Sequence, residues 1–134
     1  MTVGIVGLGL IGGSFAKAYL AAGATVLAYN RSRSVLDFAM MSGAVDGELT
    51  QDNVSACDLV LIARYPEATV DWFRRMAAHI GSHPVVVDCG GTKRTICAAC
   101  FPIAQAHGIT FLGGHPMAGT QFSGFKNAKA DLFH

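Results

Sequence analysis

The sequence predicts an α/β domain in which a doubly wound, mainly parallel sheet carries helices on both faces. Short runs of β-branched and other apolar residues alternate with longer amphipathic segments along the whole chain. Such runs, separated by helices of about ten residues or more, are typical of βαβ units. A glycine-rich turn follows the first run directly, and no repeat or Pro/Gly/Ser-rich linker divides the 134 residues. We therefore expect one domain, residues 1–134.

The elements follow from these runs in order. Parallel strands that are buried on both faces read as continuous apolar runs, and helices show an apolar face with a period near 3.6. The expected strands are 2–7, 24–30, a weak and short one within 42–50, 57–63, 83–90 and 108–114. The expected helices are 11–22, 34–42, 66–80 and 92–107. Gly23 is placed to end the first helix and Pro66 to begin the third.

Composition excludes several classes of partner. Apolar residues make up 51% of the chain, charged residues 14%, and the formal net charge is +1. This balance indicates a globular protein and gives no support to a nucleic-acid or anionic-membrane partner. The start, MTVGIVGLG, lacks the pattern of a signal peptide, and no apolar run approaches the roughly 18 residues of a membrane span. A cytoplasmic protein is expected.

The four cysteines, at 57, 89, 97 and 100, are expected to be reduced thiols in that compartment. The Cys97-x-x-Cys100 spacing can bind zinc or carry redox chemistry. However, no second pair completes a set of four ligands, and this pair lies well inside a helical pattern. We expect two small residues packed in a helix and no metal site.

The turn after the first strand contains Gly7-x-Gly9-x-x-Gly12 at the start of a helix. In a dinucleotide site the first glycine permits the tight turn, the second admits the pyrophosphate, and the third allows close packing of helix on strand. The helix N-terminus supplies free N–H groups to the phosphates. A Rossmann-type fold with a dinucleotide on residues 7–12 (Gly7, Leu8, Gly9, Leu10, Ile11 and Gly12) is predicted. The alternative is a glycine-rich turn without a ligand.

The end of the second strand indicates which dinucleotide binds. An NAD site usually carries an acidic residue there, whereas this chain has Asn30, Arg31 and Ser32. A guanidinium can hold a 2′-phosphate through two hydrogen bonds, and a serine hydroxyl can add a third. We expect these residues to contact the cofactor and NADP to be preferred over NAD. The alternative is that Arg31 stacks on adenine and both nucleotides bind.

A histidine follows the last expected strand, in FLGGHPMAGT. Ligands of such sheets bind at the carboxyl ends of the strands, so His115 should face the nicotinamide end of the cofactor. Pro116 restricts the backbone of His115. A histidine near its ordinary pKa can accept a proton from an alcohol while a hydride leaves the same carbon. The alternative is a capping or core histidine.

Three segments, GLGLIGGS at 7–14, DCGGTK at 88–93 and GGHPMAGTQFSGFKNAKADLF at 113–133, resemble the nucleotide-binding domain of prephenate and arogenate dehydrogenases. The resemblance implies oxidative decarboxylation of prephenate to 4-hydroxyphenylpyruvate, or of arogenate to tyrosine, in aromatic amino acid biosynthesis. It makes His115 the residue that binds and deprotonates the ring hydroxyl. It does not distinguish prephenate from arogenate.

The same resemblance implies a second, helical domain that forms a homodimer and binds the substrate's carboxylates. We expect that domain, and the last strands of the nucleotide domain, to lie beyond residue 134. The 134-residue chain alone is then expected to bind nucleotide but to be inactive or weakly active.

The chain departs from the family pattern at two loops. Where the family often has serine after the glycine of DxGSxK, this sequence has Gly91, so Thr92 is the neighbour that could supply the hydroxyl. With Lys93 these residues are expected to bind the substrate, and Gly90 the cofactor. The small residue–proline turn after the fourth strand is Ala63-Arg64-Tyr65 before the proline. These three residues are expected to contact the cofactor, at its nicotinamide ribose or at its pyrophosphate.

Two other functions fit part of this pattern. A reductase of the β-hydroxyacid dehydrogenase or pyrroline-carboxylate reductase type also has a glycine turn, often with Asn-Arg after the second strand, but would not carry the HPMAG–SG block. A nucleotide-sensing module without catalysis would need no base at His115.

Overall fold

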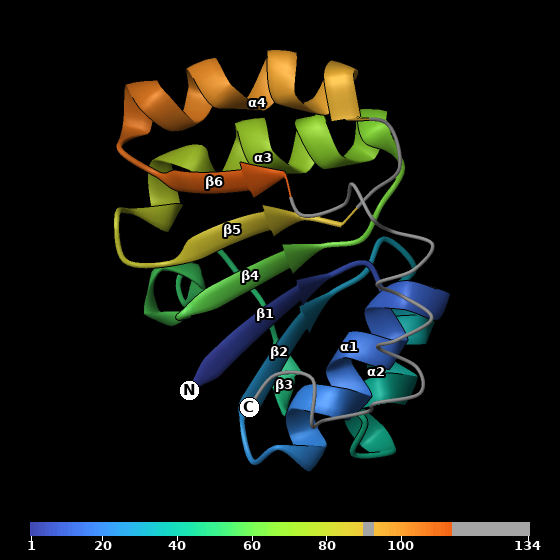
Figure 1. The fold of residues 1–134 in the computed structure, drawn as a ribbon. Coiled ribbons are helices and arrows are strands. Elements are labelled where there is room, and N and C mark those ends of the chain that lie inside the picture. Colours follow the sequence, from blue (N-terminus) through green and yellow to red (C-terminus); the bar gives the residue numbers. More distant parts are fainter. Residues whose placement is uncertain (90–92, 114–134) are drawn as a thin grey trace.

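The computed structural model describes residues 1–89 and 93–113, and in these ranges it confirms the predicted doubly wound α/β fold. Six strands form one sheet in the order β3-β2-β1-β4-β5-β6, and every neighbouring pair is parallel. The strands are β1 (Thr2–Val6), β2 (Thr25–Tyr29), β3 (Gly47–Glu48), β4 (Leu59–Ile62), β5 (Val85–Asp88) and β6 (Thr110–Gly113). The strand order turns back at β1, which lies between β2 and β4 (Figure 1).

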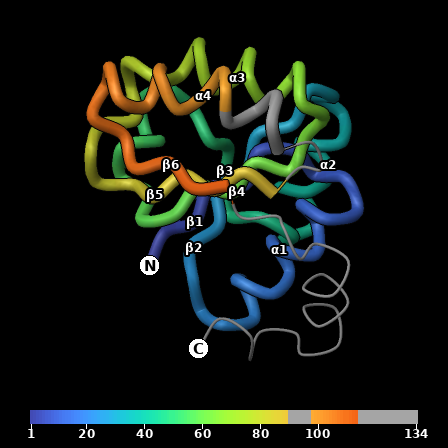
Figure 2. Tube along the Cα trace, turned by 45° about the horizontal axis from the view of Figure 1, so that its top comes forward, coloured from blue at the N-terminus to red at the C-terminus, as the bar shows by residue number. Residues whose placement is uncertain are grey.

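The helices cover both faces of the sheet. They are α1 (Leu10–Ala21), α2 (Arg33–Met41), the 3₁₀ turn η1 (Val54–Ala56), α3 (Pro66–Ile80) and α4 (Lys93–His107). Figures 1 and 2 show α1 and α2 together on one face, and α3 and α4 together on the other. Among the described residues, no helix combines the length and the apolar character that a membrane crossing requires.

The two faces of the sheet build two hydrophobic clusters. Phe15, Tyr19 and Leu36 from α1 and α2 belong to the first, and Trp72 and Phe73 from α3 to the second. The central strand β1 is buried from its second residue onward, which explains its continuous apolar sequence. Each fully buried large side chain contributes about 1.5–3 kcal/mol relative to an exposed one. This core holds the loops at the carboxyl edge of the sheet in position.

Local sequence explains where the helices end. Gly23 follows α1 with a φ of +89°, and Gly81 ends α3 with a φ of +75°, both in the left-handed region that glycine adopts without strain. Pro66 is the first residue of α3, where its missing N–H has no helical partner to lose. Pro102 lies inside α4, which nevertheless runs to His107 as predicted.

The cysteine pair lies within α4, as predicted, and the Cys100 side chain is buried. Burial, and to a lesser degree the carboxylate of Asp58, raises the pKa of Cys57 to about 11, so this thiol is a neutral packing group. No cluster of three or more potential metal ligands (His, Cys, Asp or Glu) occurs in the described part of the chain.

Candidate dinucleotide-binding site

The glycine turn joins β1 to α1 at the carboxyl edge of the sheet. Gly7 has a φ of +97°, and a Cβ there would lie 2.5 Å from the carbonyl oxygen of Ala63. A Cβ on Gly12 would overlap the carbonyl oxygen of Gly7. Each of these two positions therefore requires glycine for a separate steric reason, the turn at Gly7 and the helix–strand contact at Gly12.

Gly9 differs from both, because no described atom lies within 4 Å of the point that its Cβ would occupy. Within the part of the chain that the structure describes, the backbone is therefore open on this side, at the residue that caps the N-terminus of α1. Gly9 has no side chain with which to cap this terminus, and the first turn of α1 contains no acidic residue. The first N–H groups of a helix carry roughly half a positive charge in total. The open side of Gly9 and these N–H groups together fit a pyrophosphate.

Asn30, at the end of β2, holds the glycine turn from the side. Its Oδ1 accepts a hydrogen bond from the Leu8 N–H at 2.9 Å, and its Nδ2 donates to the Ser32 carbonyl at 3.2 Å. The backbone adds a second tie, because the Gly7 N–H donates to the Tyr29 carbonyl at 2.7 Å. The sequence predicts that Asn30 contacts the cofactor. The structure adds a different role, in which Asn30 orders the turn.

The residues after Asn30 differ in whether their side chains bond to other described residues of the fold. Ser32 caps α2 by accepting a hydrogen bond from the Val35 N–H at 3.4 Å. Arg33 pairs with Asp37 at 3.1 Å and with Glu48 at 2.8 Å, and the hydrogen bond to Glu48 is the main cause that raises the pKa of its guanidinium. Arg31 is exposed and forms no ion pair with any described residue. Of the two guanidiniums, that of Arg31 is the one left to bind an anion.

The loop after β4 reaches the same edge from the other side of β1. A Cβ on Gly7 would lie 2.9 Å from Cγ of Arg64, so the Arg64 side chain passes beside the glycine turn. Its Cζ lies 5.6 Å from the ring centroid of Tyr29. The loop is anchored by the Thr69 hydroxyl, which donates to the Arg64 carbonyl at 3.2 Å. Tyr65 projects outward and is 87% exposed.

Sequence reasoning did not assign a role to Tyr29. The only signal is an aromatic residue immediately before Asn30, and this residue type is also common in strands for packing reasons alone. Its significance comes from contact with Arg64, a residue from a loop that is distant in the sequence. No local pattern reports such a contact.

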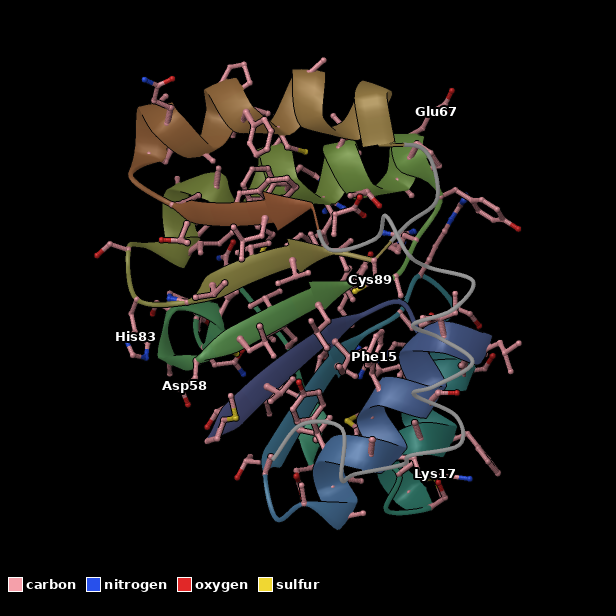
Figure 3. All side chains as sticks on the ribbon, in the orientation of Figure 1. Phe15, Lys17, Asp58, Glu67, His83 and Cys89 are labelled. Atoms are coloured by element: carbon pink, nitrogen blue, oxygen red, sulfur yellow. The ribbon has the colours of Figure 1, made fainter. Side chains whose placement is uncertain are left out.

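Strands β5 and β6 end side by side, because Asp88 of β5 is in register with Gly113 of β6. Asp88 is fully buried, and the Cys89 N–H donates to the Ile62 carbonyl at 2.8 Å. Figure 3 shows Cys89 at the carboxyl edge of the sheet.

Burial, with a smaller contribution from Cys89, raises the pKa of Tyr19 to about 12, so its hydroxyl stays protonated at neutral pH.

Four predicted site residues, Gly90, Gly91, Thr92 and His115, lie outside the described residues. Lys93 is the first residue of α4. Gly113, the last residue of β6, precedes His115 by two positions. The described part of the site is thus its nucleotide end, made by the loops after β1, β2 and β4.

The matching family model and the curated relatives agree on one family. The family model for the prephenate dehydrogenase nucleotide-binding domain matches residues 15–134. Among the curated proteins, the chain is 31% identical over 137 residues to prephenate dehydrogenase of Bacillus subtilis, covering 98% of this chain and 37% of that protein. It is 32% identical over 135 residues to cyclohexadienyl dehydrogenase of Zymomonas mobilis, covering 98% of this chain and 45% of that protein.

Among solved structures, the chain is similar to prephenate dehydrogenase from A. aeolicus in complex with hydroxyphenyl propionate and NAD⁺. The TM-score is 0.66 and the sequence identity 29%, over 89% of this chain and 42% of that one. The chain therefore spans less than half the length of each of these relatives.

Proposed function

Because this chain belongs to the family of prephenate dehydrogenase nucleotide-binding domains, we propose that it is the nucleotide-binding part of an enzyme that oxidises and decarboxylates prephenate or arogenate. The observation that carries this proposal is the combination of a ligand-ready glycine turn with the GGHPMAG segment, which starts at the end of β6 beside the buried end of β5. A ligand of such a sheet binds at the carboxyl edge, where the glycine turn lies and where β6 ends at Gly113.

A bound nicotinamide dinucleotide supplies a hydride acceptor. The chain's own contribution is to hold and orient the reactants, and to take up one proton. In the overall reaction the ring carbon that bears the hydroxyl loses a hydride, the hydroxyl loses its proton and the ring carboxylate leaves as carbon dioxide. The electron pair of the broken carbon–carbon bond completes the aromatic ring, and the phenolate oxygen takes a proton back. We assign the hydroxyl proton to the imidazole of His115. We assign substrate contacts also to Gly91, Thr92 and Lys93, and a cofactor contact to Gly90.

We further propose NADP as the preferred cofactor. The exposed Arg31, which has no carboxylate partner among the described residues, supports this preference, and no acidic residue ends β2. A carboxylate at this place would repel a 2′-phosphate, whereas a guanidinium binds it. The relative from A. aeolicus was solved with NAD⁺, so the family fold by itself accommodates a nicotinamide dinucleotide without deciding between the two.

The relatives are more than twice as long as this chain. We propose that the groups that bind the substrate's carboxylates, and a dimer interface, belong to residues outside this sequence. Substrate turnover is therefore assigned to the intact protein.

The test is an activity assay of the intact protein in which prephenate and arogenate are each combined with NADP⁺ and NAD⁺. Oxidation should require one of these substrates and should proceed faster with NADP⁺ at equal nucleotide concentration. His115→Asn should lower kcat by about 10²- to 10⁴-fold, the range of one general base, with little change in the Kd of the nucleotide. His107→Asn, at the exposed end of α4, is the matched control and should leave kcat unchanged.

Two results would contradict the proposal. Absence of turnover with both substrates would reject the reaction, and full activity of His115→Asn would favour a protein in which this histidine has no chemical role. Nucleotide binding without any oxidation would support a sensing module.

A further inference from the structure

The Arg64 side chain crosses the carboxyl edge of the sheet from β4 to β2. Arg64 follows β4, Tyr29 ends β2, and β1 lies between these two strands. The Arg64 side chain passes Gly7 at the end of β1, and its Cζ then lies 5.6 Å from the centroid of the Tyr29 ring. The guanidinium is therefore next to the residue that directly precedes Asn30 and Arg31.

The Tyr29 ring that receives this guanidinium is itself held on several sides. Its backbone carbonyl accepts the hydrogen bond from the Gly7 N–H, and its side chain packs partly buried against the cluster under α3. Arg75 of α3, which pairs with Asp71 at 2.9 Å, also lies near the Tyr29 side chain. The ring face attracts a cation, and this attraction biases where a long side chain rests. Tyr29 is a positioning residue for Arg64.

Like the guanidinium of Arg31, that of Arg64 has no carboxylate partner among the described residues. By contrast, the neighbouring Arg33 and Arg75 are both paired with carboxylates. Arg31 follows the end of β2 closely in the sequence, and the Arg64 guanidinium, which comes from the other side of β1, lies beside the Tyr29 ring at that end. The adenosine ribose of a dinucleotide lies at this end of β2 in such folds.

We propose that Arg64 is a second specificity-determining residue, which together with Arg31 binds the 2′-phosphate of NADP. This inference rests on the NADP preference proposed above and extends it to a loop 33 positions further along the chain. For Arg64 it replaces both partners that the sequence suggested for this loop, the nicotinamide ribose and the pyrophosphate. A guanidinium that extends past Gly7 to the β2 end is directed to the adenosine ribose, away from the nicotinamide ribose.

The decisive measurement is the Kd of four ligands by isothermal titration calorimetry on the intact protein, without substrate: NADP⁺, NAD⁺, 2′,5′-ADP and 5′-AMP. Arg64→Gln should raise the Kd of NADP⁺ and of 2′,5′-ADP by roughly tenfold or more, which corresponds to the loss of one hydrogen bond to a charged group. NAD⁺ and 5′-AMP, which lack the 2′-phosphate, should change by less than about twofold. Arg74→Gln, an exposed arginine on α3, is the matched control and should change none of the four.

Two Tyr29 variants test the positioning role. Tyr29→Phe keeps the ring under Arg64 and should retain most of the selectivity for NADP⁺ over NAD⁺. Tyr29→Leu removes the ring and should lower that selectivity in the same direction as Arg64→Gln, while Tyr29→Leu combined with Arg64→Gln should be no worse than Arg64→Gln alone. A variant that merely unfolded would lose NAD⁺ as well.

Equal weakening of NADP⁺ and NAD⁺ by Arg64→Gln would overturn the inference, because the pyrophosphate or a ribose common to both would then be the partner. No weakening of either would overturn it as well. Arg31→Gln separates this failure from that of the proposed cofactor preference. If Arg31→Gln weakens NADP⁺ selectively and Arg64→Gln does not, the preference stands and only the role of Arg64 is wrong.

Discussion

Replacing Gly9 by alanine should separate nucleotide binding from the stability of the fold. Gly9 has a φ of −69°, which any L-residue adopts, and its added Cβ would meet no described atom within 4 Å. Gly12→Ala is the contrasting variant, because its Cβ would overlap the backbone carbonyl of Gly7. One change therefore intrudes on the space for the ligand, and the other on the protein itself.

The magnitudes follow from these contacts. At Gly9, the lower entropy of the unfolded alanine variant stabilises by about 0.4–1 kcal/mol, and the poorer helix cap costs about the same, so the free energy of unfolding should change little. At Gly12, overpacking against backbone costs about 1–3 kcal/mol, of which the better helix propensity of alanine offsets less than about 1 kcal/mol. For nucleotide binding, Gly9→Ala should raise the Kd at least about tenfold, because the phosphates can no longer approach the N–H groups of α1 closely.

The assay is urea unfolding of the intact protein, followed by far-ultraviolet circular dichroism, with and without NADP⁺. At a concentration 100 times the wild-type Kd, NADP⁺ should stabilise the wild type by about 2.7 kcal/mol and Gly9→Ala by only about 1.4 kcal/mol. Without nucleotide, Gly9→Ala should unfold near the wild-type midpoint and Gly12→Ala at lower urea. The reasoning would be refuted if NADP⁺ stabilised Gly9→Ala as strongly as it stabilises the wild type. It would also be refuted if Gly9→Ala were less stable than the wild type without nucleotide.

Two further predictions concern residues that hold the edges of the sheet. Asn30→Ala removes the hydrogen bond to the Leu8 N–H and should raise the Kd of NADP⁺ and of NAD⁺ by a similar factor, several-fold, because the glycine turn binds both nucleotides. A calorimetric titration in which only the Kd of NADP⁺ changed would contradict this. At the opposite edge, the Thr2 N–H and the His83 ring at 2.8 Å hold the pKa of Asp58 below its usual 3.8 (Figure 3). A lowered folded-state pKa gives a stabilisation that is fully present above the unfolded-state pKa and is lost as pH falls through the folded-state pKa. Asp58→Asn should therefore be less stable than the wild type at pH 6 and lose this difference as pH falls below 3.8 and through the lowered pKa, and a difference independent of pH in urea unfolding would contradict the assignment.

The main elements could be predicted because their signals are local. Helices α1, α2 and α4 begin and end within one residue of their expected positions, and α3 at the expected residues, since each depends on an apolar face and on terminal residues such as Gly23 and Pro66. The weak strand within 42–50 is only Gly47–Glu48, an edge strand that pairs with β2 alone. The 3₁₀ turn Val54–Ala56 was not predicted, because three residues are too few to show a period.

The site was predictable to the extent that it depends on backbone geometry. Gly7, Gly9 and Gly12 have the distinct steric environments that the motif implies, and their roles need only the turn between a strand and a helix. Arg31 and Arg33 look equivalent in the sequence. Only the structure distinguishes them, because Arg33 pairs with Glu48, which lies on the neighbouring edge strand.

The sequence by itself determined the fold class, the glycine turn and the family to which the chain belongs, because each of these is a pattern along one stretch of chain. The tertiary structure alone decided that Asn30 orders the glycine turn and that Arg64 reaches the Tyr29 ring. Both contacts join loops from different strands, and their existence depends on the order β2-β1-β4 at the centre of the sheet. Strand order is set by how the whole core packs, so no local spacing of residues could reveal which side chains meet at its edge.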